Sequence, residues 1–303
     1  MKRVLVTGAN GFIGCNCLPL LLNREYEVHG IIPKGEKKLD IPQVKWHVAN
    51  LLDLSCIPSL LEEVKASHLL HFAWTTTPGV YWTSVENIAW LQSSLKLLWA
   101  FKSHGGQRIL MAGSCAEYDW RFGYCSEHVT PLQPGSLYGI CKESLYRILM
   151  SYAEQEGLSA AWGRIFFLYG PHEHPSRLVP NVINALLEGK PAACTHGKQI
   201  RDYLFVKDVA SAFVALLDSD VSGALNIASG NPIALKEIIY GIGNKLMRPE
   251  LIRLDALPVP DSEPSLLVAD VQRLSQELDW HPSYTLGQGL DETIKWWKKQ
   301  KQL

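Results

Sequence analysis

The sequence predicts an α/β protein built on a doubly wound parallel sheet, with a smaller α/β cap contributed by the C-terminal part of the chain. Short apolar runs alternate with amphipathic stretches through the first 170 residues, the pattern of parallel strands covered by helices on both faces. A glycine-rich turn joins the first run to the first stretch. Prolines 171, 175, 180 and 191 then interrupt this alternation. We therefore expect a Rossmann-type domain over residues 1–170, rejoined by residues 203–230, and a substrate-binding cap mainly over residues 171–303.

The expected elements follow from the apolar periodicity of each segment. Continuous apolar runs predict strands at residues 3–7, 27–32, 44–48, 68–72, 108–112 and 160–165. Helical spacing predicts helices between them at residues 12–23, 55–65, 86–103 and 137–156. In the second half, helices are expected at residues 178–188, 208–217, 235–245, 271–278 and 290–299.

Composition excludes several classes of protein. The 303 residues are 47% hydrophobic, and 29 basic against 30 acidic residues give a net charge of -1. This balance gives no electrostatic reason to expect nucleic acid or an anionic membrane as partner. No apolar run is long enough to span a bilayer, and the first residues read as a strand instead of a secretion signal. We expect a cytoplasmic protein.

The seven cysteines, at positions 15, 17, 56, 115, 125, 141 and 194, are odd in number and scattered. Reduced thiols are therefore favoured over a disulfide framework. No second Cys or His pair stands at zinc spacing near Cys15 and Cys17, so no structural metal is expected.

The glycine-rich turn is the first functional motif. Gly8, Gly11 and Gly14 lie between the first expected strand and the first expected helix. Gly8 permits a sharp turn, Gly11 lets a pyrophosphate approach the backbone, and Gly14 lets the helix pack closely on the sheet. The helix N-terminus then offers free N–H groups to phosphates. In this position the trio predicts dinucleotide binding.

The end of the second expected strand bears on the choice of dinucleotide. NAD-binding units place an acidic residue there for the ribose hydroxyls, and residues 28–35 contain none. Lys34, with Lys37 and Lys38 nearby, would instead suit a 2′-phosphate, although a solvated lysine loop explains the same residues. We expect NADP(H), with NAD(H) as the alternative.

Tyr138 and Lys142 form a candidate acid/base pair. Four residues apart on an expected helix, they share one face, and an ammonium beside a phenol lowers the pKa of the phenol. Such a tyrosine exchanges a proton with a hydroxyl or carbonyl group while hydride moves to or from nicotinamide. Ser114 follows the strand at residues 108–112, where a parallel sheet places its site.

Five segments together resemble the extended short-chain dehydrogenases/reductases, in the NAD-dependent epimerase/dehydratase family of nucleotide-sugar enzymes. The resemblance covers nearly the whole chain. The matching segments are residues 7–14, the cofactor turn; residues 114–118, a serine four residues before a tyrosine; residues 138–142, YxxxK; residues 164–171, similar to RxxNxYGP; and residues 201–210, similar to RDFxxVxDVA.

The resemblance implies a role for each matching residue. Ser114, Tyr138 and Lys142 would be catalytic. A nucleotide-sugar would meet Phe167, Val179 and Arg201, the last of which would bind its phosphates. The cofactor would contact Gly8, Asn10, Gly11, Phe12, Ile13, Gly14, Lys34, Asn50, Leu51, Phe72, Ala73, Trp74, Tyr138, Lys142 and Ile165.

The sequence also departs from the family pattern. The 4,6-dehydratases of the family carry Asp-Glu directly after the catalytic Ser or Thr, where this chain has Cys115 and Ala116, so the acid and base for eliminating water are missing. Glu117 is expected to point elsewhere. Phe167 replaces a usual Asn, which would narrow the sugar site or favour a deoxy sugar; core filling is the alternative.

Further residues have two interpretations each. Asn50 stands where Asp is common in the family. Cys115, His172 and His174 are candidate acid/base groups near the sugar. The alternative for the two histidines is a position on the surface without a catalytic role. Aromatic residues 74, 81 and 82 either pack on the sugar or nicotinamide or simply pack in their loop.

Several functions remain open at this point. A 4-keto reductase acting on an NDP-(6-deoxy)-4-keto-sugar is favoured, with an NDP-sugar 4-epimerase as the alternative and a dehydratase disfavoured. A redox-silent dinucleotide-binding regulatory protein ranks below an enzyme because Ser114, Tyr138 and Lys142 are all present. By resemblance, the helices at residues 86–103 and 137–156 would pair two subunits into a homodimer through a four-helix bundle.

Overall fold

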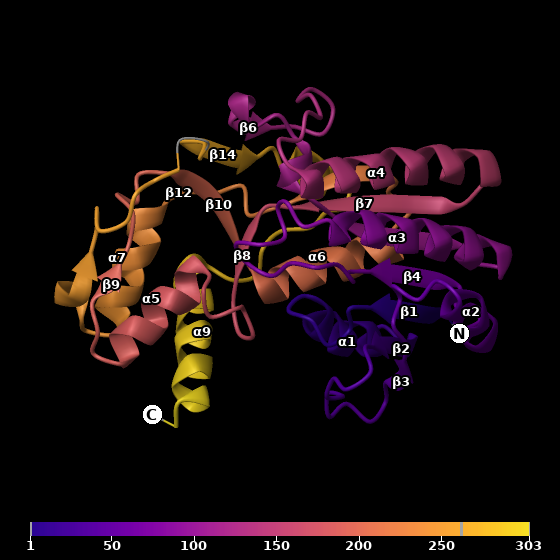
Figure 1. The fold of residues 1–303 in the computed structure, drawn as a ribbon, viewed down its shortest axis with the longest axis horizontal. Coiled ribbons are helices and arrows are strands. Elements are labelled where there is room, and N and C mark those ends of the chain that lie inside the picture. Colours follow the sequence, from indigo (N-terminus) through magenta and orange to yellow (C-terminus); the bar gives the residue numbers. More distant parts are fainter. Residues whose placement is uncertain (1, 261–262, 303) are drawn as a thin grey trace.

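The computed structural model describes residues 2–260 and 263–302. Its centre is a seven-stranded sheet in which every pairing is parallel, in the order β11-β7-β5-β4-β1-β2-β3 (Figure 1). The order reverses between β1 and β4, and such a reversal opens a crevice at the carboxyl ends of the strands. The seven strands are β1 (Arg3–Thr7), β2 (Glu27–Ile32), β3 (Lys45–Val48), β4 (His68–His71), β5 (Arg108–Ser114), β7 (Ser159–Ile165) and β11 (Gly223–Ile227).

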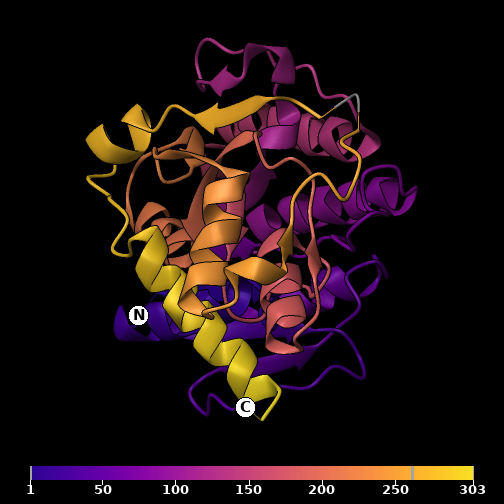
Figure 2. The same ribbon diagram turned by 90° about the vertical axis from the view of Figure 1, so that its left-hand side faces the viewer.

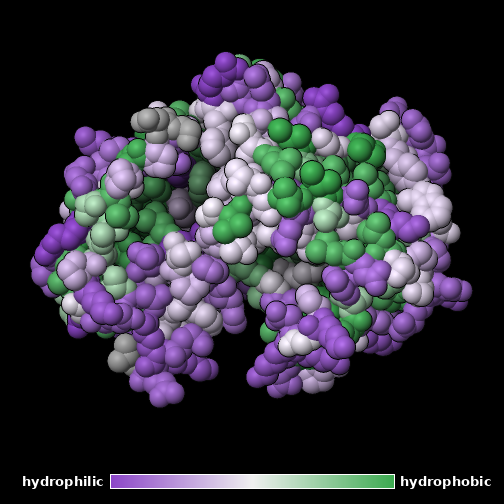
Figure 3. Space-filling view, in the orientation of Figure 1, coloured by the Kyte–Doolittle hydropathy of each residue, from purple (hydrophilic) through white to green (hydrophobic). Residues whose placement is uncertain are grey.

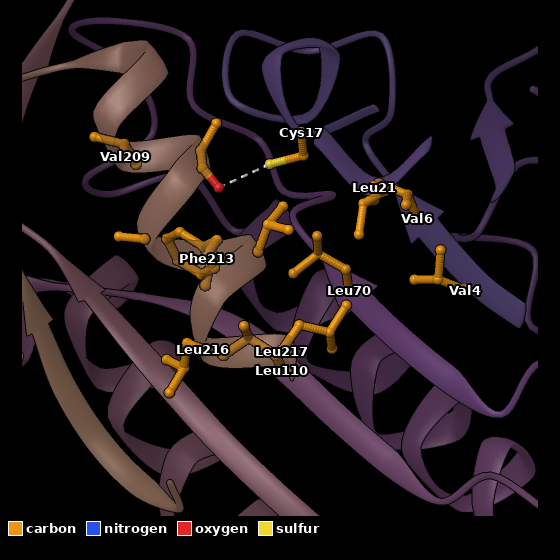
Figure 4. Packing of buried hydrophobic residues seen from close by; sticks show 14 of the residues in the cluster. Val4, Val6, Cys17, Leu21, Leu70, Leu110, Val209, Phe213, Leu216 and Leu217 are labelled. Atoms are coloured by element: carbon orange, nitrogen blue, oxygen red, sulfur yellow. Dashed lines mark hydrogen bonds between the residues drawn. The ribbon is translucent and has the colours of Figure 1, made fainter. Parts of the chain in front are cut away.

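Helices cover both faces of this sheet, as the Rossmann-type prediction requires. On one face, α2 (Cys56–Val64), α3 (Glu86–Ser103) and α4 (Leu137–Glu156) enclose one apolar cluster. On the other, α1 (Gly14–Asn23) and α6 (Val206–Asp218) enclose a second. Figure 4 shows the second cluster, in which the Cys17 thiol lies 3.9 Å from the carbonyl oxygen of Ala210. The two buried faces explain why the strands read as continuous apolar runs.

The two longest helices begin and end where the sequence predicts. In α4, the Ser136 hydroxyl accepts a hydrogen bond from the Gly139 N–H at 3.1 Å, and Gly157 ends the helix in the left-handed conformation with φ of 61°. These are the usual start and stop signals of a helix. The predicted bounds of α3 and α4 are therefore confirmed to the residue, as are those of β1 and β2.

Other boundaries differ from the prediction for local reasons. β5 continues to Ser114, two residues beyond its predicted end, because it pairs with β7 over that whole length. The last helix, α9 (Leu286–Gln300), begins four residues early, because Thr285 and Gln288 form a capping box there.

A second sheet forms the base of the cap, on the left in Figure 1. It has the order β12-β10-β14-β6, with β8 also paired to β10. The sequence pattern locates no strands here because they are short and pair with distant segments. The strands are β6 (Tyr124–Cys125), β8 (Phe167–Tyr169), β10 (Ile200–Phe205), β12 (Pro232–Ala234) and β14 (Leu266–Ala269), and a separate pair is β9 (Ala192–Ala193) with β13 (Ile252–Arg253).

Three helices complete the cap: α5 (Leu178–Leu187), α7 (Leu235–Lys245) and α9. They pack around an apolar cluster of their own, and α7 and α9 lie toward the viewer in Figure 2. A short helix, α8 (Gln272–Gln276), packs beside β11. Within the described residues, no helix combines the length and apolarity needed to cross a membrane.

Candidate active site

A cavity of about 910 Å³ lies at the carboxyl ends of the parallel strands and reaches into the cap. Its lining joins the glycine-rich turn, the ends of β4 and β5, the start of α4, the segment after β8, and parts of β10 and α9. A crevice at this edge of an open parallel sheet is where ligands of such folds bind. The geometry thus brings residues from both halves of the chain to one site.

The glycine-rich turn forms one end of the cavity. Gly8 has a φ of 65°, and its carbonyl oxygen accepts a hydrogen bond from the Gly11 N–H at 3.0 Å. A Cβ on Gly14 would collide with the carbonyl oxygen of Gly8, and a Cβ on Gly8 would lie 3.0 Å from the Ala73 nitrogen. All three glycines line the cavity. The turn is therefore an open backbone cradle that fits the pyrophosphate of a dinucleotide.

Most other expected cofactor contacts line the same end of the cavity. They are Asn10, Phe12, Ile13, Asn50, Leu51, Phe72, Ala73, Trp74 and Ile165. Lys34 differs: it is exposed, and the cavity wall described here includes its neighbour Pro33 but not Lys34 itself.

Ser114, Tyr138 and Lys142 all line this cavity. The end of β5 carries Ser114, whose hydroxyl accepts a hydrogen bond from the Ala116 N–H at 3.2 Å. The first turns of α4 carry Tyr138 and Lys142, which are 8% and 4% exposed. All three residues line the cavity that contains the glycine-rich turn.

Burial dominates the protonation of this group. It lowers the pKa of Lys142 to about 7, against an opposing effect of Glu117. Burial also raises the pKa of Tyr138 above its ordinary value, while hydrogen bonding by Ser114 acts in the other direction. The expectation that Lys142 depresses the phenol pKa is therefore wrong for this structure. The cause is that both groups leave water, which favours the neutral form of each.

The two residues after Ser114 carry no acid, and the third, Glu117, is not part of the described cavity wall. Cys115 lines the cavity, and burial raises the pKa of its thiol. Glu117 is fully buried and turns into the core, as expected: its carboxylate accepts hydrogen bonds from the Trp162 indole at 3.0 Å and from Arg164 Nε at 2.7 Å. Its role is to close the turn after β5, where it also accepts from the Ser114 N–H.

Aromatic rings surround the Tyr138 phenol. Tyr81 lies 4.9 Å from it between ring centres, Trp82 5.7 Å and Trp74 6.4 Å, all nearly perpendicular to it. Trp120 adds a further ring 5.8 Å from Trp82. These rings pack on one another, as loop packing predicts, and they also line the cavity.

The cap side of the cavity differs from what the resemblance implies. Phe167 stacks on Tyr203 at 5.5 Å and lines the cavity. Arg201 also lines it, but is 1% exposed and forms an ion pair with Glu263. Val179, at the start of α5, is buried in the apolar core of the cap and is not part of the described cavity wall. The apolar environment of α5 accounts for this placement.

The segment after β8 supplies residues that sequence reasoning missed or left open. His172 has a φ of 72° and packs 4.7 Å from Trp296 of α9. Glu173 is 7% exposed, its Oε2 has no hydrogen-bond partner within residues 2–260 and 263–302, and burial raises its pKa to about 8. Both line the cavity, as does Arg177. No local sequence signal marks Glu173, because its burial depends on the cap folding against the sheet.

Comparison with known proteins agrees with this geometry. A family described as the NAD dependent epimerase/dehydratase family matches residues 4–228. The chain is 25% identical to a UDP-glucose 4-epimerase of Corynebacterium glutamicum, covering 93% of this chain and 92% of that one. It is 26% identical to a CDP-abequose synthase of Salmonella typhimurium, covering 97% and 98%.

A solved structure shows the same similarity in three dimensions. The UDP-glucuronic acid 4-epimerase of Bacillus cereus, in complex with UDP-glucuronic acid and NAD, superposes with a TM-score of 0.85 at 25% identity. The superposition covers 99% of this chain and 100% of that one. The neighbour thus binds NAD and a nucleotide-sugar in a fold of this kind.

Proposed function

Because the chain belongs to the NAD dependent epimerase/dehydratase family, we propose that it transfers hydride at the sugar ring of a nucleotide-sugar, with Tyr138 as acid/base. The observation that carries the proposal is that Ser114, Tyr138 and Lys142 line the same cavity as the glycine-rich turn. When bound, the nicotinamide supplies or accepts the hydride.

The protein residues transfer the proton and position the substrate and cofactor. Tyr138, protonated in its buried environment, donates a proton to the oxygen of a keto group as that oxygen gains negative charge. The Ser114 hydroxyl hydrogen-bonds the same oxygen. Lys142, with a pKa near 7, is able to hold or release a proton beside the phenol. Gly8, Asn10 and Gly11 would hold the pyrophosphate of the cofactor.

We infer that the reaction is reduction of a 4-keto sugar, and that a 6-deoxy sugar suits the site. A 4-epimerase must present both faces of its keto intermediate to the nicotinamide, which requires room for the ring to turn. The rings of Trp74, Tyr81 and Trp82 crowd Tyr138 and favour a single orientation. Phe167 adds a further apolar surface to the cavity wall, which favours a sugar with fewer hydroxyls.

A 4-epimerase is the second candidate. The neighbour with UDP-glucuronic acid and NAD bound and the similarity to a UDP-glucose 4-epimerase favour it. A dehydratase is not proposed, because Cys115 and Ala116 follow Ser114 and the Glu117 carboxylate faces Arg164 in the core.

One experiment separates the candidates. Purified protein is incubated with each of NAD⁺, NADP⁺, NADH and NADPH and with UDP-, dTDP-, GDP- or CDP-sugars, including 4-keto-6-deoxy forms, and both cofactor absorbance and sugar products are followed. Stoichiometric loss of reduced cofactor with a 4-keto-sugar is the expected result. Interconversion of two sugars without net loss would select the epimerase, and no turnover of any nucleotide-sugar would contradict the proposed function.

The preference for NADP(H) is a separate proposal. It is supported by the absence of an acidic residue in residues 28–35 and by the position of Lys34 next to Pro33, which lines the cavity. K34A should weaken NADPH binding about fivefold and leave NADH binding unchanged, whereas K190A, at an exposed site in the cap, should change neither. Equal affinity of the wild-type protein for both cofactors would contradict this proposal.

We also propose that two copies of the chain associate through α3 and α4. Figure 3 shows apolar side chains gathered on the face that these helices form, and Ile88, Trp99 and Ile148 on them are 48%, 52% and 44% exposed. An apolar patch of this kind is typical of an interface. W99E should shift the protein from dimer to monomer in sedimentation, while V129E, at another exposed apolar site, should not. A monomeric wild-type protein would contradict the proposal.

A further inference from the structure

Glu173 occupies an unusual position on the cap wall of the cavity. It follows β8 in a turn in which the Glu173 N–H donates a hydrogen bond to the Gly170 carbonyl oxygen at 3.3 Å. The preceding residue, His172, has the strained φ of 72°, and its ring packs on Trp296. The turn therefore holds the Glu173 side chain inward, where only 7% of the residue is exposed and the cavity is its open neighbour.

The carboxyl group of Glu173 is incompletely satisfied by the protein. Its Oε2 atom is buried and has no hydrogen-bond partner among the described residues. Leaving a buried polar group unpaired costs about 1–3 kcal/mol, and more for a charged group. Buried polar groups in folded proteins are paired as a rule, so an unpaired one facing a cavity calls for a ligand.

The surroundings of Glu173 indicate which part of a ligand it would meet. Arg177 is the cation that acts on Glu173 most directly, and its guanidinium lies 5.4 Å from the centre of the Tyr81 ring. The Tyr81 ring in turn lies 4.9 Å from Tyr138. Arg177 and Tyr81 thus connect Glu173 with the proposed acid/base along the cavity wall.

We propose that Glu173 is a specificity-determining residue that hydrogen-bonds a hydroxyl group of the sugar held beside Tyr138. This inference rests on the proposed function. A sugar hydroxyl both donates and accepts, so it satisfies the Glu173 carboxyl group in either protonation state. A diphosphate would repel an ionised carboxylate and offers no donor. Beside the aromatic rings of this wall, a carboxyl group at Glu173 would fix which hydroxyl, and which ring orientation, is accepted.

The test compares ligands with and without the sugar. Dissociation constants are measured by titration calorimetry, with NADP⁺ or NAD⁺ present so that a keto sugar is not reduced, for UDP-glucose, dTDP-glucose, CDP-glucose, GDP-mannose and their 4-keto-6-deoxy forms, each beside its free nucleoside diphosphate. The variants are E173M, which keeps the volume and removes both oxygens, and E173Q, which keeps one acceptor. E237Q, at an exposed site on α7, is the matched control.

For the sugars that the wild-type protein binds, E173M should weaken binding about tenfold, the loss of one hydrogen bond to a buried group, and E173Q should weaken it less. Binding of the nucleoside diphosphates should stay within about twofold. E173M should also melt at a higher temperature than the wild type, because an unpaired buried carboxyl is removed. If Glu173 instead stabilises the fold, E173M should melt at a lower temperature than the wild type.

Two results would overturn the inference alone: unchanged sugar binding in E173M, or equal weakening of the nucleotide-sugar and its diphosphate, which would assign Glu173 to the nucleotide. If E173M does not fold, E173Q decides by the same comparison. If the wild-type protein binds the free diphosphates or a dinucleotide but none of the nucleotide-sugars, including the 4-keto-6-deoxy forms, the proposed function fails and this inference fails with it.

Discussion

The side-chain nitrogen of Lys142 lies 3.8 Å from the centre of the Trp74 ring and donates a hydrogen bond to the Ala112 carbonyl oxygen at 2.9 Å. Trp74 belongs to the loop after β4, whereas Ala112 belongs to β5, so the amine is held between two neighbouring strand ends. This enclosure removes water from the amine, and the removal of water lowers its pKa to about 7.

The enclosed amine makes stability depend on pH. The pKa of Lys142 is about 7 in the folded protein and about 10.5 when unfolded. Between these values the unfolded chain binds more protons, so the free energy of unfolding should rise with pH, by up to about 1.4 kcal/mol per pH unit. K142M lacks this dependence. Its stability relative to wild type should be highest below pH 7 and fall as pH rises toward 10.

Urea denaturation at several pH values measures this difference. K299M, at an exposed position of α9, should follow the wild type at every pH. The burial argument for Lys142 would be wrong if the difference between K142M and wild type were the same at pH 6.5 and pH 9.5.

The glycine-rich turn has no room for a side chain at Gly14. In G14A the new Cβ would meet the Gly8 carbonyl oxygen, and relieving that contact must move the cradle. We expect a loss of about 1–3 kcal/mol in stability, typical of overpacking, and weaker binding of the dinucleotide. G135A adds a Cβ where nothing lies within 4 Å. Melting temperature and cofactor fluorescence titration check this, and similar cofactor affinity in both variants would speak against the cradle.

The buried pair of Glu117 and Arg164 should be important for stability and not for proton transfer. E117Q leaves the Arg164 charge uncompensated in the core, at a cost of about 3–5 kcal/mol. Adding R164M to E117Q should restore part of that loss, since the unpaired charge is then gone. Chemical denaturation of the four proteins in this cycle gives the coupling. Additive losses would show that the two side chains act independently.

Much of the fold follows from local sequence. The sheet strands are continuous apolar runs, and α3 and α4 carry enough periodicity and capping to be located to the residue. The strands of the second sheet escape prediction because their pairing is distant: β14 joins β6 of the first half of the chain with β10 of the second. Two- to six-residue strands carry too little pattern to reveal such pairing.

The residues of the site also differ in whether local sequence or distant contacts determine their properties. Glycine spacing and the Tyr138–Lys142 pair are local and can be recognised in the sequence. The burial that raises the pKa of Tyr138, the partner that Arg201 finds in Glu263, and the inward turn of Glu173 all depend on the cap closing over the sheet. Such properties arise from tertiary contacts, so no window of sequence contains them.

The central claim is that the Tyr138 phenol provides the proton in hydride transfer. The most direct measurement is single-turnover oxidation of reduced cofactor by Y138F with a substrate found in the nucleotide-sugar panel, next to Y240F at an exposed position of α7. We predict that Y138F loses at least about a hundredfold in rate while its cofactor affinity is unchanged, and that Y240F behaves as wild type. Hydride transfer by Y138F at the wild-type rate would contradict the claim.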